Sequence, residues 1–212
     1  MTMTRLQAAL DVLPLIAILR GITPEDADAI GSALYEAGFR IVEVPLNSPR
    51  PEQSIALLRR LLPPKVSIGA GTVLDPAAVA SIANAGGDLI VMPHSDATVI
   101  RAAKARGLSC VPGVATPSEA FTALAAGADA LKAFPAEMIT PPVVKAWRAV
   151  LPKDTRVLPV GGIGPQSMAA YIAAGANGFG LGSALYKPGA SATDVAASAA
   201  AFVTAWRALQ AS

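Results

Sequence analysis

The sequence predicts an α/β fold, a single (β/α)8 TIM barrel that spans residues 1–212 and begins with a short N-terminal helix. Three observations predict it: eight short apolar runs, a helical segment after each of them, and a repeat of roughly 20 to 25 residues. The first run is LPLIAILRG, and later ones include KVSIGAGTV and TRVLPVGGI. Because the runs are apolar on both faces, they are typical of parallel strands covered by helices.

The first residues predict the short helix, because Leu6, Leu10 and Leu13 recur at spacings of three and four. This segment has no long apolar stretch followed by a small-residue cleavage site. No part of the chain has the 18 or so uninterrupted apolar residues of a membrane span. We therefore expect a soluble, cytoplasmic protein with no membrane partner.

The joints between helices and strands repeat a small pair that ends in glycine. They read EAGFRIVEVPL, NAGGDLIVMPH, ARGLSCVPGVA, AAGADALKAFPA and AAGANGFGLGS. Glycine supplies the left-handed conformation that ends a helix, and Thr-Pro or Asp-Pro pairs open helices in TPEDADA, DPAAVAS and TPSEAFT. The alternative is an open doubly wound sheet, but the first joint lacks the G-x-G-x-x-G turn of that fold.

Composition excludes several classes of protein. The chain is 53% hydrophobic and 15% charged, which predicts a folded globular protein rather than a disordered one. The net charge is only +2 and the basic residues are scattered, so a nucleic-acid partner is not expected. The single cysteine, Cys110, excludes an internal disulfide and is interpreted as a small buried hydrophobic residue.

In this fold the chemistry lies at the carboxyl ends of the strands, so polar residues that follow the apolar runs are the candidates. They are Arg20, Glu43, Asn47, Thr72, His94, Thr116, Lys132, Glu137, the pair Gly161 and Gly162, and the pair Gly182 and Ser183.

Lys132 is the most unusual of these residues, because it stands in the apolar segment GADALKAFPAE. A buried ammonium group without a partner tends to lose its proton, and a neutral lysine is a nucleophile that can form a Schiff base with a ketone. In a strand, Lys132 shares a face with Ala130 and Phe134, and pointing inward it reaches the barrel mouth. The alternative is an outward lysine whose tip lies in water between helices.

Glu43 is a second titratable group in an apolar run, IVEVPL. A carboxylate that faces an amine or imine can move protons on a substrate as a general acid and base. The alternative is a structural ion pair of Glu43 with Lys132 or Arg20.

The last two runs, PVGGIGPQS and FGLGSALY, place glycines where backbone N–H groups can approach an anion. Loops after strands seven and eight commonly form the phosphate site of such barrels, so Gly161, Gly162, Gly182 and Ser183 are candidate phosphate ligands. The glycines could instead serve only to relieve crowding in tight turns.

Arg20, in AILRG, offers a planar donor group suited to a carboxylate or phosphate. His94 is the only histidine and is interpreted as a polar lining or surface residue. With no second histidine and no cysteine at ligand spacing, no metal site is expected.

Taken together, the motifs EVPLNSP, IGAGTV, ALKAFPAE, PVGGI and GLGSALY resemble the bacterial class I aldolases of the KDPG/KHG family, which act on 2-dehydro-3-deoxy-6-phospho sugar acids. The resemblance covers nearly the whole chain. It implies a homotrimeric TIM barrel, without metal or other cofactor, that cleaves a phosphorylated keto acid to pyruvate and D-glyceraldehyde 3-phosphate.

The resemblance also implies roles for individual residues. Lys132 corresponds to the Schiff-base lysine and Glu43 to the general acid and base. The family's ligand contacts fall on Arg20 and Thr72 at the pyruvate end and, at the phosphate end, on Gly161, Gly162, Gly182 and Ser183.

Within the family, ILRG, PLNSP and PVGG are similar to the phosphogalactonate branch. In the phosphogluconate branch we expect a threonine and an arginine in the PLNSP motif and a threonine in place of Val160. The two substrates differ only in configuration at C4. Activity on the phosphogluconate epimer or on both epimers, and a phosphate-binding barrel without lyase activity, are the alternatives.

Overall fold

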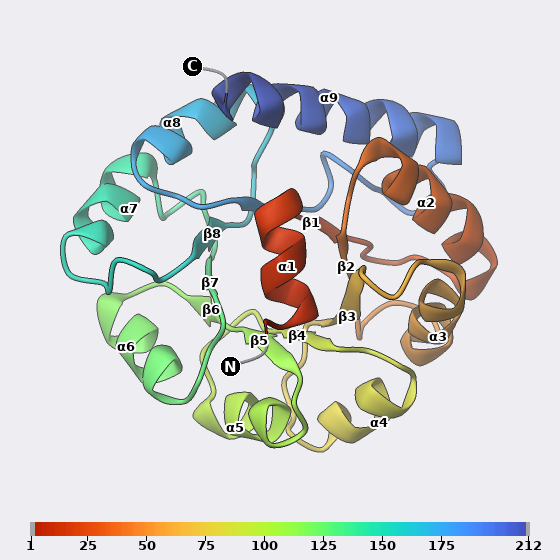
Figure 1. Ribbon diagram of the computed structural model, residues 1–212, viewed down its shortest axis with the longest axis horizontal. Helices are drawn as coiled ribbons and strands as arrows, with labels where there is room; N and C mark the ends of the chain where they lie inside the picture. The colour runs from red at the N-terminus through yellow and green to blue at the C-terminus, as the bar shows by residue number, and fades with distance from the viewer. Residues whose placement is uncertain (1–2, 211–212) are drawn as a thin grey trace.

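The computed structural model describes residues 3–210, in which parallel strands lie inside a ring of helices (Figure 1). The strands are β1 (Leu15–Ile18), β2 (Ile41–Pro45), β3 (Ser67–Gly71), β4 (Leu89–Val91), β5 (Ser109–Val111), β6 (Gly113–Val114), β7 (Leu131–Ala133), β8 (Val157–Pro159) and β9 (Phe179–Leu181). Each of the eight apolar runs forms a strand, and the fifth run forms two.

The hydrogen bonding corrects the expected fold class. Instead of one closed eight-stranded barrel, the strands form a six-stranded sheet in the order β5-β4-β3-β2-β1-β9 and a separate three-stranded sheet in the order β6-β7-β8. The fifth run is divided at Pro112, which has no N–H group to donate. Between β8 and β9 there is only an isolated bridge that joins Val160 to Gly180. The expectation of a closed (β/α)8 barrel was therefore wrong.

The outer helices cover the strands. They are α2 (Pro24–Ala37), α3 (Pro51–Leu61), α4 (Ala78–Asn84), α5 (Ala97–Ala105), α6 (Pro117–Ala125), α7 (Pro141–Arg148), α8 (Met168–Ala173) after the 3-10 turn η1 (Pro165–Ser167), and α9 (Ala192–Gln210). Pro24 and Pro117 each follow a threonine and open their helices, as the Thr-Pro pairs predict. Within residues 3–210, none of the helices is both long enough and apolar enough to cross a lipid bilayer.

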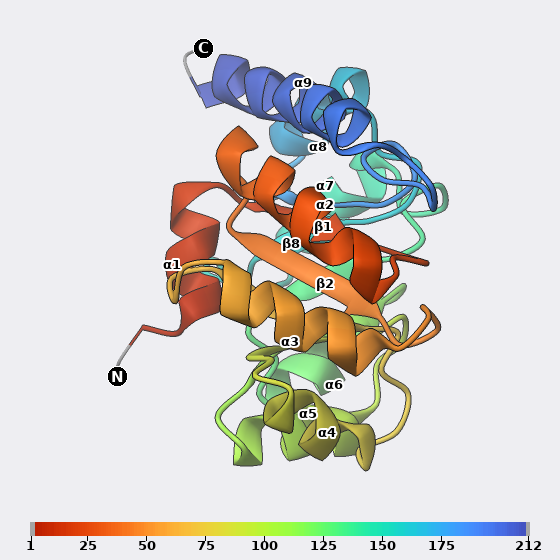
Figure 2. The same ribbon diagram turned by 90° about the vertical axis from the view of Figure 1, so that its right-hand side faces the viewer.

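The first helix, α1 (Arg5–Val12), lies at one end of the strands rather than in the ring (Figure 2). Its Leu6 and Leu10 are buried in a cluster with apolar side chains of the strands, among them Ile16, Ile41 and Leu158. The helix therefore covers the amino ends of the strands, and the opposite end is left for a site.

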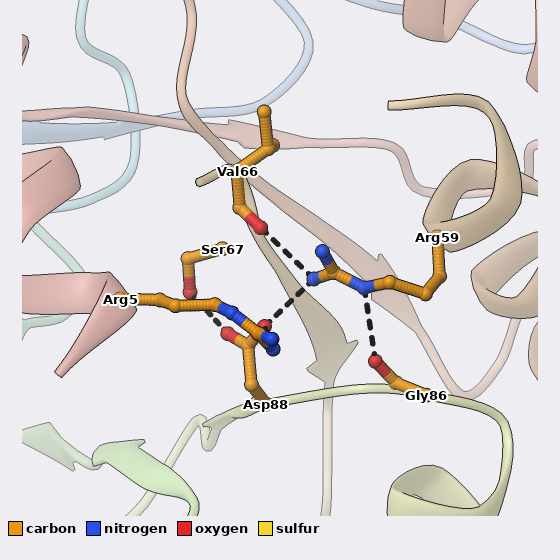
Figure 3. Close-up of polar contacts among 6 residues, drawn as sticks. All are labelled: Arg5, Arg59, Val66, Ser67, Gly86 and Asp88. Carbon is orange, nitrogen blue, oxygen red and sulfur yellow. Dashed lines mark hydrogen bonds and ion pairs between the residues drawn. The ribbon is translucent and has the colours of Figure 1, made fainter. Parts of the chain in front are cut away.

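Asp88 joins α1 to the rest of the fold (Figure 3). Its carboxylate accepts hydrogen bonds from Arg5 of α1 (3.1 Å), Arg59 of α3 (2.7 Å) and Ser67 of β3 (2.6 Å). Arg59 also donates to the backbone carbonyl groups of two neighbouring loops. This cluster lies far along the strands from their carboxyl ends, and we interpret it as structural.

Candidate active site

A cavity of about 680 Å³ opens at the carboxyl ends of β1, β2, β7, β8 and β9. It brings together most of the residues that the sequence singled out. Those in its wall are Arg20, Asn47, Lys132, Phe134, Glu137, Gly161, Gly162, Gly182 and Ser183.

The alternation of side chains along each strand directs the titratable residues toward this end of the fold. Ile16, Ile41 and Ala130 belong to the inner apolar cluster beneath α1. Two positions further along the same strands, on the same face, stand Ile18, Glu43 and Lys132. In the ladder between β1 and β2, Ile18 pairs with Glu43. The interior is thus apolar at the end that α1 covers and carries titratable groups at the open end.

Lys132 is buried, with 6% of its surface exposed, and lines the cavity. Its Nζ lies 4.7 Å from the centroid of the Phe134 ring. Burial lowers the pKa of Lys132, and the negative charge of Glu43 opposes that shift less strongly. The outward orientation considered from the sequence is therefore wrong. The side chain has the environment of a lysine that reacts as a neutral amine.

Glu43 is 1% exposed, and its Oε2 atom is buried without a hydrogen-bond partner. Burial raises the pKa of Glu43 to about 7, and the charges of Lys132 and Arg20 oppose this shift. In the part of the chain that the structure describes, no ion pair joins Glu43 to either of them. The structural ion pair considered from the sequence is thus not formed, and a carboxyl group of this pKa can exchange protons near neutral pH.

Gly71, at the end of β3, makes room for the Glu43 carboxylate. A Cβ atom at Gly71 would overlap Oε2 of Glu43 and lie 2.6 Å from its Oε1. The next residue, Thr72, has a φ of 55°, a left-handed conformation that is uncommon for threonine. The IGAGTV motif therefore shapes the space that holds Glu43 in place, a role that the sequence alone did not reveal.

We expect Gly71→Ala to lower kcat by about 100-fold, because the added methyl group displaces the carboxylate of Glu43, the expected acid and base, from its position. Trapping of pyruvate on Lys132 should survive, since the lysine is on β7, whereas Gly71 ends β3. Steady-state kinetics and borohydride trapping measure the two effects.

The same substitution in a Glu43→Ala background is the control. No carboxylate is left to displace there, so Gly71→Ala should change kcat by less than about two-fold. An equal loss in both backgrounds would show that Gly71 acts through the backbone and not through Glu43.

Arg20 extends into the cavity from the end of β1, and its Nη1 donates a 2.7 Å hydrogen bond to Oδ1 of Asn47. The partner comes from the loop after β2, so two neighbouring loops fix the direction of one guanidinium group. The remaining donors of Arg20 are suited to a carboxylate.

The glycine turns after β8 and β9 form the other end of the cavity. Gly161 and Gly162 have φ values of 113° and 61°, which L side chains rarely adopt. Ser183 and Lys187, both exposed, line the same region. Lys187 did not stand out in the sequence, although it lies only four residues after Ser183 in a loop expected to bind the phosphate.

Four candidates are not among the residues that line this cavity: Glu43, Thr72, His94 and Thr116. Thr72 stands beyond Gly71, and His94 is exposed in the loop after β4. Thr116 is the N-cap of α6, where its side chain accepts a hydrogen bond from the backbone of Glu119 in a capping box. Between residues 3 and 210, no group of three or more His, Cys, Asp or Glu side chains is arranged to hold a metal ion.

Comparison with known proteins identifies the family. The family model for KDPG and KHG aldolase matches residues 6–200. The chain is 52% identical to the 2-dehydro-3-deoxy-6-phosphogalactonate aldolase of Escherichia coli K12 over 92% of this chain and 95% of that protein. It is 34% identical to the 2-dehydro-3-deoxy-phosphogluconate aldolase of Pseudomonas aeruginosa PAO1, over 76% and 72% of the two chains.

A solved structure described as native KDPGal superposes with a TM-score of 0.93 at 51% identity and covers 94% of this chain and 97% of that one. The resemblance that the sequence motifs indicated is thereby confirmed. The chain belongs to the KDPG and KHG aldolase family.

Proposed function

We propose that this protein is a class I aldolase that cleaves 2-dehydro-3-deoxy-6-phospho-D-galactonate to pyruvate and D-glyceraldehyde 3-phosphate. The observation that carries the proposal is a buried lysine of lowered pKa in the cavity wall, electrostatically coupled to a buried carboxyl group of raised pKa. Membership of the aldolase family supports the reaction class. It also supports a phosphorylated keto acid as the substrate.

The reaction begins with the neutral amine of Lys132. Its nitrogen lone pair attacks the C2 carbonyl carbon of the keto acid and forms a carbinolamine, which loses water to give a protonated imine. The imine carbon draws electrons from the C3–C4 bond. We assign Arg20, directed by Asn47, to the substrate carboxylate, so that C2 faces Nζ of Lys132.

Glu43 acts in the bond-breaking step. Its carboxylate takes the proton of the C4 hydroxyl group, the C3–C4 bond breaks, and D-glyceraldehyde 3-phosphate leaves. The electron pair of that bond forms an enamine on Lys132. Protonation at C3 and addition of water at C2 then release pyruvate and restore the amine.

The far end of the substrate carries the phosphate, which we assign to Gly161, Gly162, Gly182 and Ser183, with Lys187 as a nearby cation. Binding energy gathered at this end orients C3 and C4 against Lys132 and Glu43. The unphosphorylated sugar acid should therefore lose kcat as well as affinity.

The C4 configuration is assigned from two observations. Identity is 52% to the phosphogalactonate enzyme of E. coli and 34% to the phosphogluconate enzyme of P. aeruginosa. In the cavity, Val160 packs against Gly180, with Ile18 nearby, and presents an apolar wall without a hydroxyl group.

Comparing kcat/KM for the two pure epimers tests this assignment. We expect the galacto epimer to be preferred by at least about 10-fold, because the two epimers direct the C4 hydroxyl group differently toward Glu43 once C2 is held at Lys132. Release of pyruvate, coupled to an indicator enzyme, gives both values. Equal values or a preference for the gluco epimer would contradict the assignment, although the Schiff-base chemistry would stand.

We also propose that residues 1–212 act as one catalytic domain and that three copies associate, as the family resemblance implies. Sedimentation equilibrium gives the mass of the assembly directly.

A further inference from the structure

Glu137 is the one acidic side chain among the described residues that line the cavity. The other charged residues in the wall are basic: Arg20, Lys132 and Lys187. The mechanism above uses those basic groups but gives Glu137 no role. Its position at the phosphate end therefore needs an explanation.

The carboxylate of Glu137 lies against the glycine turn that we assign to the phosphate. A Cβ atom at Gly161 would overlap Oε2 of Glu137, and one at Gly162 would lie 3.1 Å from Oε1. Both oxygens thus lie close to the two glycines that we assign to the phosphate.

The backbone next to Glu137 is held in place from two sides. The N–H group of Ala136 donates to the carbonyl oxygen of Val160 (2.9 Å), and the hydroxyl group of Tyr171 donates to the carbonyl oxygen of Ala136 (2.8 Å). Ala136 is 2% exposed. Glu137 can therefore leave the glycine turn by side-chain rotation but not by a shift of its backbone.

The side chain itself is not tied down. Among residues 3–210, Glu137 forms no side-chain hydrogen bond and no ion pair. It is exposed to solvent. Rotation away from the turn therefore breaks no hydrogen bond or ion pair with another described side chain, and the carboxylate is free to move when a ligand arrives.

From this geometry we propose that Glu137 is a specificity-determining residue that competes with the phosphate for the Gly161-Gly162 turn. This inference rests on the proposed function, because it takes that turn as the phosphate site. A carboxylate and a phosphate are both oxyanions, so they repel each other at contact distance. The phosphate must displace the Glu137 side chain or bind beside it.

This competition weakens the binding of phosphorylated ligands and leaves the binding of unphosphorylated ones unaffected. It lowers the discrimination between phosphorylated and unphosphorylated substrates. It also speeds the release of D-glyceraldehyde 3-phosphate, because the carboxylate can return to the turn as the product leaves.

Glu137→Gln tests the inference, since the amide keeps the size of the side chain and removes its charge. We expect inorganic phosphate to bind about three- to ten-fold more tightly to the variant than to wild type in isothermal titration calorimetry. The KM for the phosphorylated keto acid should fall by a similar factor. The kcat/KM for its unphosphorylated analogue should stay within two-fold of wild type.

Glu36→Gln is the matched control, because Glu36 is an exposed glutamate on α2 outside the cavity. It removes the same charge and should leave phosphate binding unchanged. Equal gains in both variants would mean that only net charge matters, which overturns the inference.

Unchanged or weaker phosphate binding in Glu137→Gln also overturns it. Weaker binding would show that the carboxylate helps to hold the ligand. A wild-type protein that binds phosphate but cleaves neither epimer would contradict the proposed function. In that case the calorimetric comparison would still decide the role of Glu137.

Discussion

Lys132→Ala should lower kcat by about 10⁴-fold or more, because the variant has no amine to form the covalent intermediate. Lys132→Arg should be as inactive, since a guanidinium group stays protonated and cannot attack the ketone. Both losses should appear in kcat, measured by release of pyruvate.

The structure explains why another lysine cannot take over. Lys187 lines the cavity but is exposed, and burial lowers the pKa of Lys132. Lys145, exposed on α7, provides a control whose replacement by alanine should leave kcat unchanged. Turnover by Lys132→Ala within 100-fold of wild type would exclude a Schiff base on that residue.

Glu43→Gln should reduce kcat by roughly 10²- to 10⁴-fold, the usual contribution of a positioned acid and base. The amide has nearly the same shape, so the fold and the reaction of Lys132 with pyruvate should be retained. Rapid-quench measurement of the cleavage step gives the loss. A variant with near-wild-type kcat would place the proton transfer on another group.

The pH dependence follows from the pKa of Glu43, which burial raises from 4.5 to about 7. Only the ionised carboxylate can take the C4 proton, so kcat/KM of wild type should rise as the pH increases through about 7. The lowered pKa of Lys132 means that its neutral amine also forms more readily as the pH rises. Both groups therefore favour higher activity at higher pH. A profile that is flat from pH 5 to 8 would contradict these assignments.

The stability of the folded protein should fall as the pH rises, whereas kcat/KM increases. A carboxyl group with a raised pKa in the folded state favours folding while it is protonated, and this contribution is lost as the pH rises from 4.5 to about 7. Thermal unfolding of wild type and Glu43→Gln at pH 5 and pH 8 measures it. The variant should gain stability relative to wild type at the higher pH.

Much of the secondary structure could be predicted from the sequence, because each apolar run is buried on both faces and each glycine joint ends a helix. The division of the strands into two sheets could not be predicted. Pro112 within LSCVPGVA was a visible sign that the fifth run is interrupted, since proline cannot donate a ladder hydrogen bond. The single bridge between Val160 and Gly180 depends on how the strands pack, and no local pattern specifies it.

Some residues of the candidate site could be predicted from the sequence and others could not. Lys132 and Glu43 could be selected because a titratable side chain inside an apolar run is unusual by itself. Gly71 and Glu137 matter through contacts across strands, with the carboxylate of Glu43 and with the turn at Gly161. Such contacts join residues that are far apart in the sequence. The roles of all these residues remain predictions.

One measurement tests the central claim most directly: incubation of the protein with pyruvate and sodium borohydride, digestion, and mass spectrometry of the peptides. The account predicts a single reduced pyruvate adduct on Lys132. Cleavage activity should fall in proportion to the fraction of protein that carries the adduct and should be absent when all of it does. Neither Lys132→Ala nor a sample without pyruvate should show the adduct. An adduct on another lysine, or no adduct in an active protein, would contradict the Schiff-base mechanism.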